Sequence, residues 1–416
     1  MSEPMTASGS GTPQPPGRTP HKAPRAPLRG PGGEDTPPEA SEAPAREADV
    51  ASAVVVGTGL IGTSIALALR ERGVRVGLAD RDPAAARLAA DIGAGTVVGG
   101  DFADLGEPAD LAVLAVPPAA AGPALLAAQA AGAARWYTDV ASVKAAVLDQ
   151  AAELGCDLTS FVPGHPLSGR ERSGPAAARA DLFLGRPWVI CPGPQTAPEA
   201  VAAVAALVRC CQAQEVRLTA AEHDRYVALV SHAPHVVAAA MAARLAGAAE
   251  PALMLSGQGI RDVTRIAAGD SRMWAQILAA NAVPVADVLA AVSADLAAAA
   301  EALREAAADG AGPGLKAVTG LLDEGTAGVT RIPGKHSKPR RDDMVVQVVI
   351  PDVPGELARL FRAAGDAGVN IEDIGIEHSP GLPVGVAELV VRPEAVARLT
   401  QALAASGWPV AGSIAR

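Results

Sequence analysis

The sequence predicts an α/β domain with a doubly wound parallel sheet, followed by an all-helical domain and a small α+β module. Short β-branched runs alternate with helical stretches from Ala51 onward, the strand pattern stops after Thr219, and a second strand pattern begins near Met344. Strands that alternate with helices are typical of a parallel sheet. A chain of 416 residues has room for two or three domains.

Composition excludes several classes of protein. The chain is 49% hydrophobic and carries a formal net charge of -10, which excludes a wholly disordered chain and argues against nucleic acid as a partner. Its apolar runs are broken within the roughly 20 residues that a membrane span needs, and no signal peptide opens the chain. We therefore expect a cytoplasmic protein without membrane contact.

Metal sites and disulfides are not expected. The four cysteines include the adjacent pair Cys210 and Cys211 and show no C-x-x-C spacing. His232 and His235 lie three residues apart, but no third ligand follows at a recognised spacing.

Five segments follow from composition and pattern. Residues 1–50 hold 11 prolines and 6 glycines, which predicts a disordered tail. The sheet-containing domain is expected over 51–218 and the helical domain over 219–328. Residues 329–342 form a predicted basic linker without aromatic residues to stack bases, and the α+β module occupies 343–416.

The expected elements follow the β-branched runs and the alanine-rich stretches. Strands of one parallel sheet are expected at 54–56, 74–79, 96–98, 111–116, 136–140, 161–162 and 188–190. A long helix is expected over 285–308 in the second domain. The module is expected to have strands at 345–350, 369–376 and 386–391 and helices at 355–367 and 393–405, the βαββα core of a ferredoxin-like sandwich.

A glycine motif, Gly57-Thr58-Gly59-Leu60-Ile61-Gly62, follows the first strand and opens a helix. Asp80 ends the next strand, and this context predicts a Rossmann-type dinucleotide site. Gly57 permits the tight turn, Gly59 lets the backbone approach a pyrophosphate, and Gly62 lets helix and strand pack closely. Asp80 is expected to bind the adenosine ribose and to repel a 2′-phosphate, which favours NAD over NADP. Arg81 beside it could pair with a 2′-phosphate, so NADP remains an alternative cofactor.

Two further segments end strands at the sheet edge where ligands bind. Val116 and Pro117 are expected to shape the loop near the nicotinamide ribose. Ser142 and Lys144 are expected to place a hydroxyl and an ammonium beside the cofactor. The alternatives are a helix N-cap for Ser142 and a solvent-exposed first-turn position for Lys144.

Histidines supply the candidates for proton transfer. His165 stands between Gly164 and Pro166 on a constrained loop, which suits a positioned general base. His232 and His235 share one helix face, where an intervening proline removes a backbone donor and frees a carbonyl.

Two arginines are candidates for binding a dicarboxylate. Arg261 and Arg265 are four residues apart, so both guanidinium groups are expected on the same side of one helix. Salt bridges with Asp262 or Glu250 are the alternative. Trp274 follows downstream, either at the site or as an anchor of the helical core.

These motifs together resemble the prephenate and arogenate dehydrogenases over about residues 51–325. The resemblance implies NAD-dependent oxidation and decarboxylation of prephenate to 4-hydroxyphenylpyruvate for tyrosine synthesis, by a homodimer that exchanges helices. It implies that His165 deprotonates the 4-hydroxyl with support from Ser142, and that Arg265 binds the ring carboxylate. His235 would contact the side-chain carboxylate. His232 and Arg261 are further substrate ligands by the same resemblance.

Alternatives to this assignment remain open. Arogenate dehydrogenase differs only in a substrate that carries an amine in place of a keto group. A β-hydroxyacid or imine-type dehydrogenase shares the domain pair but leaves His165 and Arg265 without a role. A non-catalytic sensor of NAD or amino acids is the third alternative.

The terminal module resembles an ACT domain, a regulatory fold that often binds amino acids. The resemblance depends on the segment from Asp352 to Ala358 and on Val369-Asn370-Ile371. Gly355 permits close backbone approach, and the helix that follows offers its N-terminus to a carboxylate. Asp352, Gly355, Asn370 and Ile371 are therefore candidate residues for tyrosine feedback, and a dimerisation lobe without ligand is the alternative.

Overall fold

A computed structural model describes residues 50–99, 102–168, 174–309, 312–332, 343–378 and 383–415. The predicted tail before Val50 and all but the first four residues of the predicted linker lie outside these ranges.

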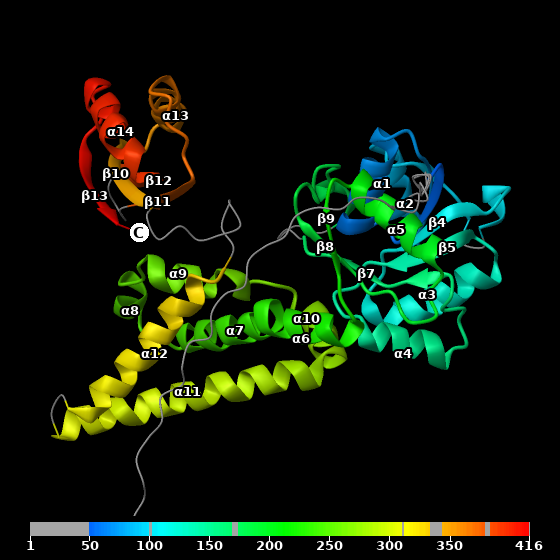
Figure 1. Cartoon of the computed structure of the whole chain (residues 1–416), viewed down its shortest axis with the longest axis horizontal. Coiled ribbons are helices and arrows are strands. Elements are labelled where there is room, and N and C mark those ends of the chain that lie inside the picture. The colour runs from blue at the N-terminus through cyan, green and yellow to red at the C-terminus, as the bar shows by residue number, and fades with distance from the viewer. Residues whose placement is uncertain are drawn as a thin grey trace, which may run out of the picture. The chain divides into compact units, whose positions relative to one another are not determined.

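The first domain contains a six-stranded parallel sheet (Figure 1). Its strands are β1 (Ser52–Val56), β2 (Arg75–Ala79), β3 (Thr96–Val97), β4 (Ala109–Leu114), β5 (Ala134–Asp139) and β6 (Phe161–Val162). The order β3-β2-β1-β4-β5-β6 is that of dinucleotide-binding domains, with the switch point between β1 and β4. This confirms the predicted Rossmann-type sheet.

Helices cover both faces of this sheet. They are α1 (Leu60–Glu71), α2 (Pro83–Asp91), α3 (Pro118–Ala130), α4 (Ala145–Glu153) and α5 (Pro198–Cys210). Val55 packs into one buried cluster with residues of α1 and α5, while its neighbour Val54 packs into a second cluster with residues of α3 and α4. Because both faces are buried, the strand is a continuous apolar run rather than an alternating one.

The prediction that residues 188–190 extend the parallel sheet is wrong. They belong to β8 (Pro187–Ile190), which pairs antiparallel with β7 (Gly164–Pro166) and parallel with β9 (Gln214–Arg217) in a separate sheet. The two-residue β6 offers a short edge, and Pro163 after it has no N–H for a ladder, so the pairing ends there. His165 therefore lies on a short strand and not on a loop.

The second domain is helical throughout, as predicted. Its elements are α6 (Ala220–Val227), a π-helical turn (Ala228–His232), α7 (Ala233–Leu245), α8 (Glu250–Met254), α9 (Gln258–Thr264), a 3₁₀ turn (Arg265–Ala267), α10 (Ser271–Ala280), α11 (Ala282–Asp309) and α12 (Pro313–Val329). Thr219 and Glu222 form a capping box that starts α6. The π turn ends two residues before Pro234, whose missing N–H leaves the regular hydrogen-bond ladder incomplete.

Two stretches of this domain, Ala220–Leu245 and Ala282–Ala308, are long and apolar enough to cross a membrane by length and composition alone. This test is weak evidence, because helices of soluble proteins also pass it. The first stretch buries His223 and Asp224, which form hydrogen bonds with residues of the first domain. Such polar residues fit a helix that docks on protein rather than one that faces lipid.

The C-terminal module has the order βαββαβ. Its elements are β10 (Met344–Pro351), α13 (Glu356–Asp366), β11 (Asp373–His378), β12 (Val384–Val391), α14 (Pro393–Ala405) and β13 (Val410–Ala415). The antiparallel sheet has the order β11-β12-β10-β13. Both helices pack against it, and Val346 of β10, Leu360 of α13 and Leu399 of α14 belong to one buried cluster. The predicted second strand begins later, at Asp373, and β13 was not predicted.

Candidate active site

The glycine motif forms the turn between β1 and α1. Gly57 has φ of +98°, and a Cβ there or at Gly62 would collide with backbone, with the carbonyl of Ala115 and that of Gly57 respectively. A Cβ at Gly59 would meet nothing within 4 Å. Gly57 and Gly62 are thus required for packing, whereas Gly59 opens onto free space at the N-terminus of α1, which begins with Leu60 and Ile61.

Asp80 follows β2 and is bonded to the same turn. One of its carboxylate oxygens accepts hydrogen bonds from the N–H (2.6 Å) and hydroxyl (2.8 Å) of Thr58, and the other accepts from the N–H of Asp82 at 2.8 Å. Partial burial opposes ionisation, but these hydrogen bonds outweigh it and lower the pKa of Asp80. The carboxylate is therefore charged at neutral pH beside the open turn.

The loops after β4 and β5 contain the other predicted cofactor residues. Val116 is half-buried, and the exposed Pro117 is the N-cap of α3. The half-buried Ser142 forms no hydrogen bond with any residue that the structure describes. The N-cap of α4 is Lys144, so the alternative role of Ser142 as a helix cap is not observed and its hydroxyl is available to a ligand.

Lys144 differs from both readings of the sequence. Its ammonium is wholly buried and donates to the carboxylate of Asp139 and to the carbonyl oxygen of Gly164. Asp139 also accepts from the N–H groups of Gly164 and Ala141. Because this ammonium is buried and donates to two protein groups, the geometry does not support its contact with the cofactor. The two contacts instead fix Gly164, the residue before His165, through its carbonyl and through the Asp139 carboxylate that accepts its N–H.

The side chain of His165 is half-buried and forms a hydrogen bond with a second histidine. Its Nδ1 lies 2.8 Å from Nε2 of His223, and Nδ1 of His223 lies 2.8 Å from the carboxylate of Asp224. Burial, followed by the charges of His223, Lys144 and His232, lowers the pKa of His165 well below its usual 6.5. The imidazole is therefore neutral at pH 7 and able to accept a proton.

The other two predicted histidines meet at Trp274. The ring of His235 stacks on Trp274 with centroids 3.7 Å apart, and His232 meets the same indole edge-on at 6.1 Å. This agrees with the prediction that the two histidines share a face. Asn281 donates to Nδ1 of His232 (3.1 Å) and to the backbone carbonyl of Asp224 (2.8 Å), which connects this group to His223. Burial lowers the pKa of His232 to about 4, so this ring is also neutral.

The two arginines lie near α7. Arg261 is on α9, but Arg265 is the C-cap of that helix and begins the 3₁₀ turn, so the prediction of one continuous helix holds only to Thr264. Both side chains are exposed, and neither forms an ion pair within the part of the chain that the structure describes. The alternative of salt bridges with Asp262 or Glu250 is not observed, and Asp262 instead accepts from Gln258.

The first two domains of the chain are similar to those of known proteins. Residues 65–217 match the model for the nucleotide-binding domain of prephenate dehydrogenase, and residues 219–317 match that for its dimerization domain. The probable prephenate dehydrogenase NovF of Streptomyces niveus is 41% identical over 363 residues, which cover 86% of this chain and 99% of that protein. The chain belongs to the prephenate dehydrogenase family.

Solved structures of the prephenate dehydrogenase family share the fold. Synechocystis arogenate dehydrogenase is 27% identical, with a TM-score of 0.56 over 67% of this chain and 99% of that one. A prephenate dehydrogenase of Aquifex aeolicus, described in complex with hydroxyphenyl propionate and NAD⁺, is 24% identical, with a TM-score of 0.59 over 68% of this chain and 98% of that one. Family membership confirms the resemblance and the dehydrogenase class that the sequence predicts.

His223 and Asp224 are the members of the site that sequence reasoning missed. A signal was present, because the capping box at Thr219 marks the start of α6, and His223, Asp224, Val227 and Ala228 then follow at the spacing of one buried helix face. A histidine next to an aspartate on the buried side of a helix requires polar partners from elsewhere in the fold.

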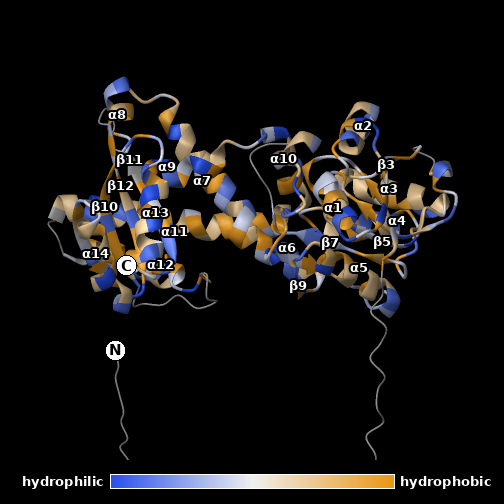
Figure 2. Cartoon of the chain, turned by 90° about the horizontal axis from the view of Figure 1, so that it is seen from above, coloured by the Kyte–Doolittle hydropathy of each residue, from blue (hydrophilic) through white to orange (hydrophobic). Residues whose placement is uncertain are grey.

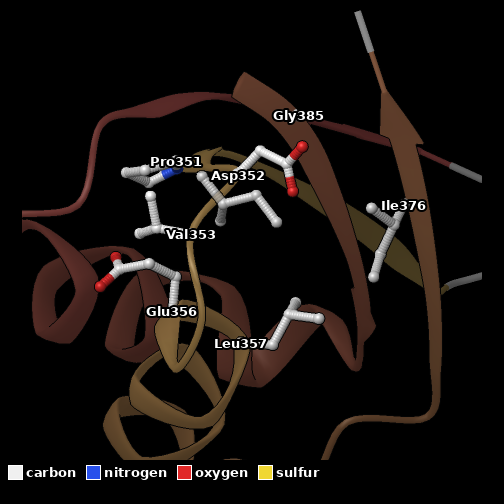
Figure 3. Close-up of a pocket in the computed structure, with 8 residues that line it drawn as sticks. Pro351, Asp352, Val353, Glu356, Leu357, Ile376 and Gly385 are labelled. Carbon is white, nitrogen blue, oxygen red and sulfur yellow. The ribbon is translucent and has the colours of Figure 1, made fainter. Parts of the chain in front are cut away.

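The C-terminal module contains a pocket of about 90 Å³ between the start of α13 and the sheet (Figure 3). Asp352, Glu356 and Leu357 line it, together with Ile350, Pro351, Val353, Ile376 and Gly385. Gly355, with φ of +94°, is the N-cap of α13 beside the pocket. Of the four predicted regulatory residues, Asp352 lines the pocket and Gly355, Asn370 and Ile371 do not. Asn370 donates to Glu372, and Ile371 packs against the module's core.

Proposed function

We propose that this chain catalyses the NAD-dependent oxidative decarboxylation of prephenate to 4-hydroxyphenylpyruvate, a step of tyrosine synthesis, in the cytoplasm. The observation that carries the proposal is the neutral imidazole of His165, which is fixed through His223 and through the Lys144 contact with Gly164. The charged Asp80 favours NAD, because it offers acceptors to a ribose diol and repels a 2′-phosphate.

The residues of the chain perform separate tasks in this reaction. The open turn at Gly59 and the carboxylate of Asp80 would hold NAD, which would supply the acceptor for the hydride of the ring carbon that bears the hydroxyl. His165 accepts the hydroxyl proton, and Ser142 supports that contact. Arg265 binds the ring carboxylate and His235 the side-chain carboxylate, while loss of carbon dioxide is driven by aromatisation. The protein thus contributes alignment and neutralisation of charge.

The charges of the site favour prephenate over arogenate. The described residues assigned to the substrate are two arginines, two histidines and a tryptophan, and none of them is an anion that would pair with an arogenate ammonium. We therefore expect kcat/KM for prephenate to exceed that for arogenate when both are measured with NAD. A higher value for arogenate would reverse this assignment.

Replacing Arg265 by Ala is expected to raise KM for prephenate roughly 10- to 100-fold, because hydrogen bonds to charged groups contribute about 1.5–3 kcal/mol. The effect on kcat is expected to be smaller, since the base is untouched. Steady-state kinetics measures both constants. Arg244→Ala, a change of another arginine near the end of α7, is the matched control and should leave KM unaltered.

A second copy of the chain is the proposed partner of the helical domain. Large apolar side chains are exposed along this domain, and hydrophobic positions follow α7 and α11 in Figure 2. They include Leu229, Val230, Met254, Leu255, Val283, Leu296, Leu322 and Val329. Exposed apolar surface of this extent is typical of an interface. Sedimentation is expected to show a species of twice the 41.6 kDa chain mass, and a monomer at micromolar concentration would contradict this.

We further propose that the C-terminal module binds an amino acid effector, with tyrosine as the first candidate. The pocket in Figure 3 combines apolar walls with the carboxylate of Asp352, which offers acceptors to an α-ammonium. The carboxylate of Glu356, which also lines the pocket, accepts from Arg359 at 2.7 Å. Tyrosine is expected to lower activity and to raise Tm, since a ligand at 100 times its Kd adds about 2.7 kcal/mol of stability.

The control for this titration is Leu357→Trp, which fills the pocket and should abolish both effects. If tyrosine changes neither activity nor Tm of the unaltered chain, the module is a dimerisation lobe without ligand.

A further inference from the structure

A line of buried polar groups extends from the first turn of α4 to the candidate base. We infer that His223 and Asp224 are positioning residues that fix the tautomer of His165 and receive the positive charge created when His165 accepts the substrate proton. This inference rests on the proposed role of His165 as the base. The contacts that carry it join residues 58 and 80 positions apart in the sequence.

Among the residues that the structure describes, every group hydrogen-bonded to the Asp224 carboxylate is a backbone amide or a histidine. One oxygen accepts from the N–H of Lys144 at 2.8 Å and contacts Nδ1 of His223, and the other accepts from the N–H of Ala145 at 2.9 Å. The two amides belong to the N-terminus of α4, where the helix dipole also favours an anion. Burial opposes ionisation, but these bonds outweigh it and lower the pKa of Asp224. The carboxylate is thus an ionised acceptor.

The ionised carboxylate determines both tautomers in turn. Because Asp224 only accepts, Nδ1 of His223 must carry the hydrogen, and in the neutral ring Nε2 is then an acceptor. The Nδ1 of His165 faces this acceptor at 2.8 Å and must therefore be the protonated nitrogen of its ring. Nε2 of His165 is left with a free lone pair, which is the atom that a general base requires.

The same contacts allow the positive charge that forms on proton transfer to move from His165 to His223. When the substrate O–H bond breaks, its proton bonds to Nε2 of His165, and the hydrogen on Nδ1 transfers to Nε2 of His223. The imidazolium is then that of His223, bonded directly to the Asp224 carboxylate. A cation kept on His165 would instead be next to the ammonium of Lys144, whose charge opposes it.

The other titratable groups around the pair do not replace this role. Asp139 is occupied by Lys144 and two backbone amides, and burial keeps His232 neutral. Burial raises the pKa of the Cys191 thiol to about 12, so it stays protonated. Within the described part of the chain, the carboxylate in contact with this pair of histidines is that of Asp224, which contacts the ring of His223.

The test is His223→Gln in the 416-residue chain. A glutamine can place its carbonyl oxygen near the position of Nε2, so it accepts from His165 and preserves the tautomer, but it cannot take the proton. We expect kcat for prephenate to fall by roughly 10-fold or more, as a fraction of the effect of a whole general base. We also expect the acid limb of the kcat/KM profile to move to lower pH, because a proton can then bind only the buried His165.

Arg225→Gln, an exposed change on the same helix, is the matched control and should retain the kcat and pH profile of the unaltered chain. A lower kcat with an unmoved acid limb would overturn the inference, because a loss of packing alone predicts that result. An unchanged kcat would overturn it as well. If H223Q does not fold, as judged by its Tm, Asp224→Asn must shift the acid limb in the same direction.

A second variant distinguishes failure of this inference from failure of the proposed function. If His165→Asn keeps full turnover, His165 is not the base and the proposed function itself fails. If His165→Asn is inactive while H223Q matches the unaltered chain in kcat and pH profile, the base stands and only the role of His223 is wrong.

Discussion

Replacing His165 by Asn is expected to lower kcat for prephenate by roughly 10²- to 10⁴-fold, the usual contribution of a positioned general base. Asn is polar and similar in size near the backbone, so β7 should keep its pairing with β8. It has no lone pair of comparable basicity to accept the hydroxyl proton. Steady-state turnover measures the loss, and a fluorescence titration with NAD should give an unaltered Kd because the glycine motif is untouched.

His378→Asn, in the C-terminal module, is the matched control for this substitution and should leave kcat as it is. In the unaltered chain, the acid limb of kcat/KM is expected below pH 6.5, because the pKa of His165 is lowered by burial and by nearby positive charge. Activity therefore rises with pH through that lowered pKa and is flat around neutrality. Full turnover by the Asn variant would remove His165 from the mechanism.

Lys144→Met is expected to reduce the free energy of unfolding by about 3–5 kcal/mol, since it leaves the buried Asp139 carboxylate without its counter-charge. Methionine fills much of the same volume, so the loss is electrostatic rather than a cavity effect. Activity should fall as well, because Gly164 loses the contact that orients the strand before His165. Chemical denaturation gives the stability change.

The exposed Lys316 provides the control, since Lys316→Met should change stability by less than about 0.5 kcal/mol. The double variant Asp139→Asn/Lys144→Met is expected to be more stable than Lys144→Met alone, because removing both charges avoids an uncompensated one. A single variant as stable as the unaltered chain would contradict the structural role of this ion pair.

Local pattern was sufficient for much of the fold. The β-branched runs placed most strands of the parallel sheet within a few residues, and the glycine motif placed the open turn at Gly59. Trp188 was misplaced because its run of apolar residues is equally compatible with two sheets. Which sheet it joins depends on pairing with Gly164–Pro166 and Gln214–Arg217, and periodicity does not encode such partners.

The candidate site was likewise predictable only where local sequence pattern was informative. His165, His232 and His235 were identified because a proline stands beside or between them in the sequence. The burial of Lys144 was not predicted, because a lysine after a strand is usually solvated and only tertiary contacts reveal its partners. His223 was missed for a related reason, since its significance comes from a ring 58 residues earlier.

The Asp224 carboxylate completes the first turn of a helix that belongs to the other domain. Folding of α4 is therefore coupled to the arrival of α6, and the proton acceptor is configured by that same event. A nucleotide-binding domain expressed alone would have a frayed helix and a histidine with an unassigned tautomer, even with its sheet intact. Turnover in this chain thus reports that its two halves have joined, and dinucleotide binding alone does not.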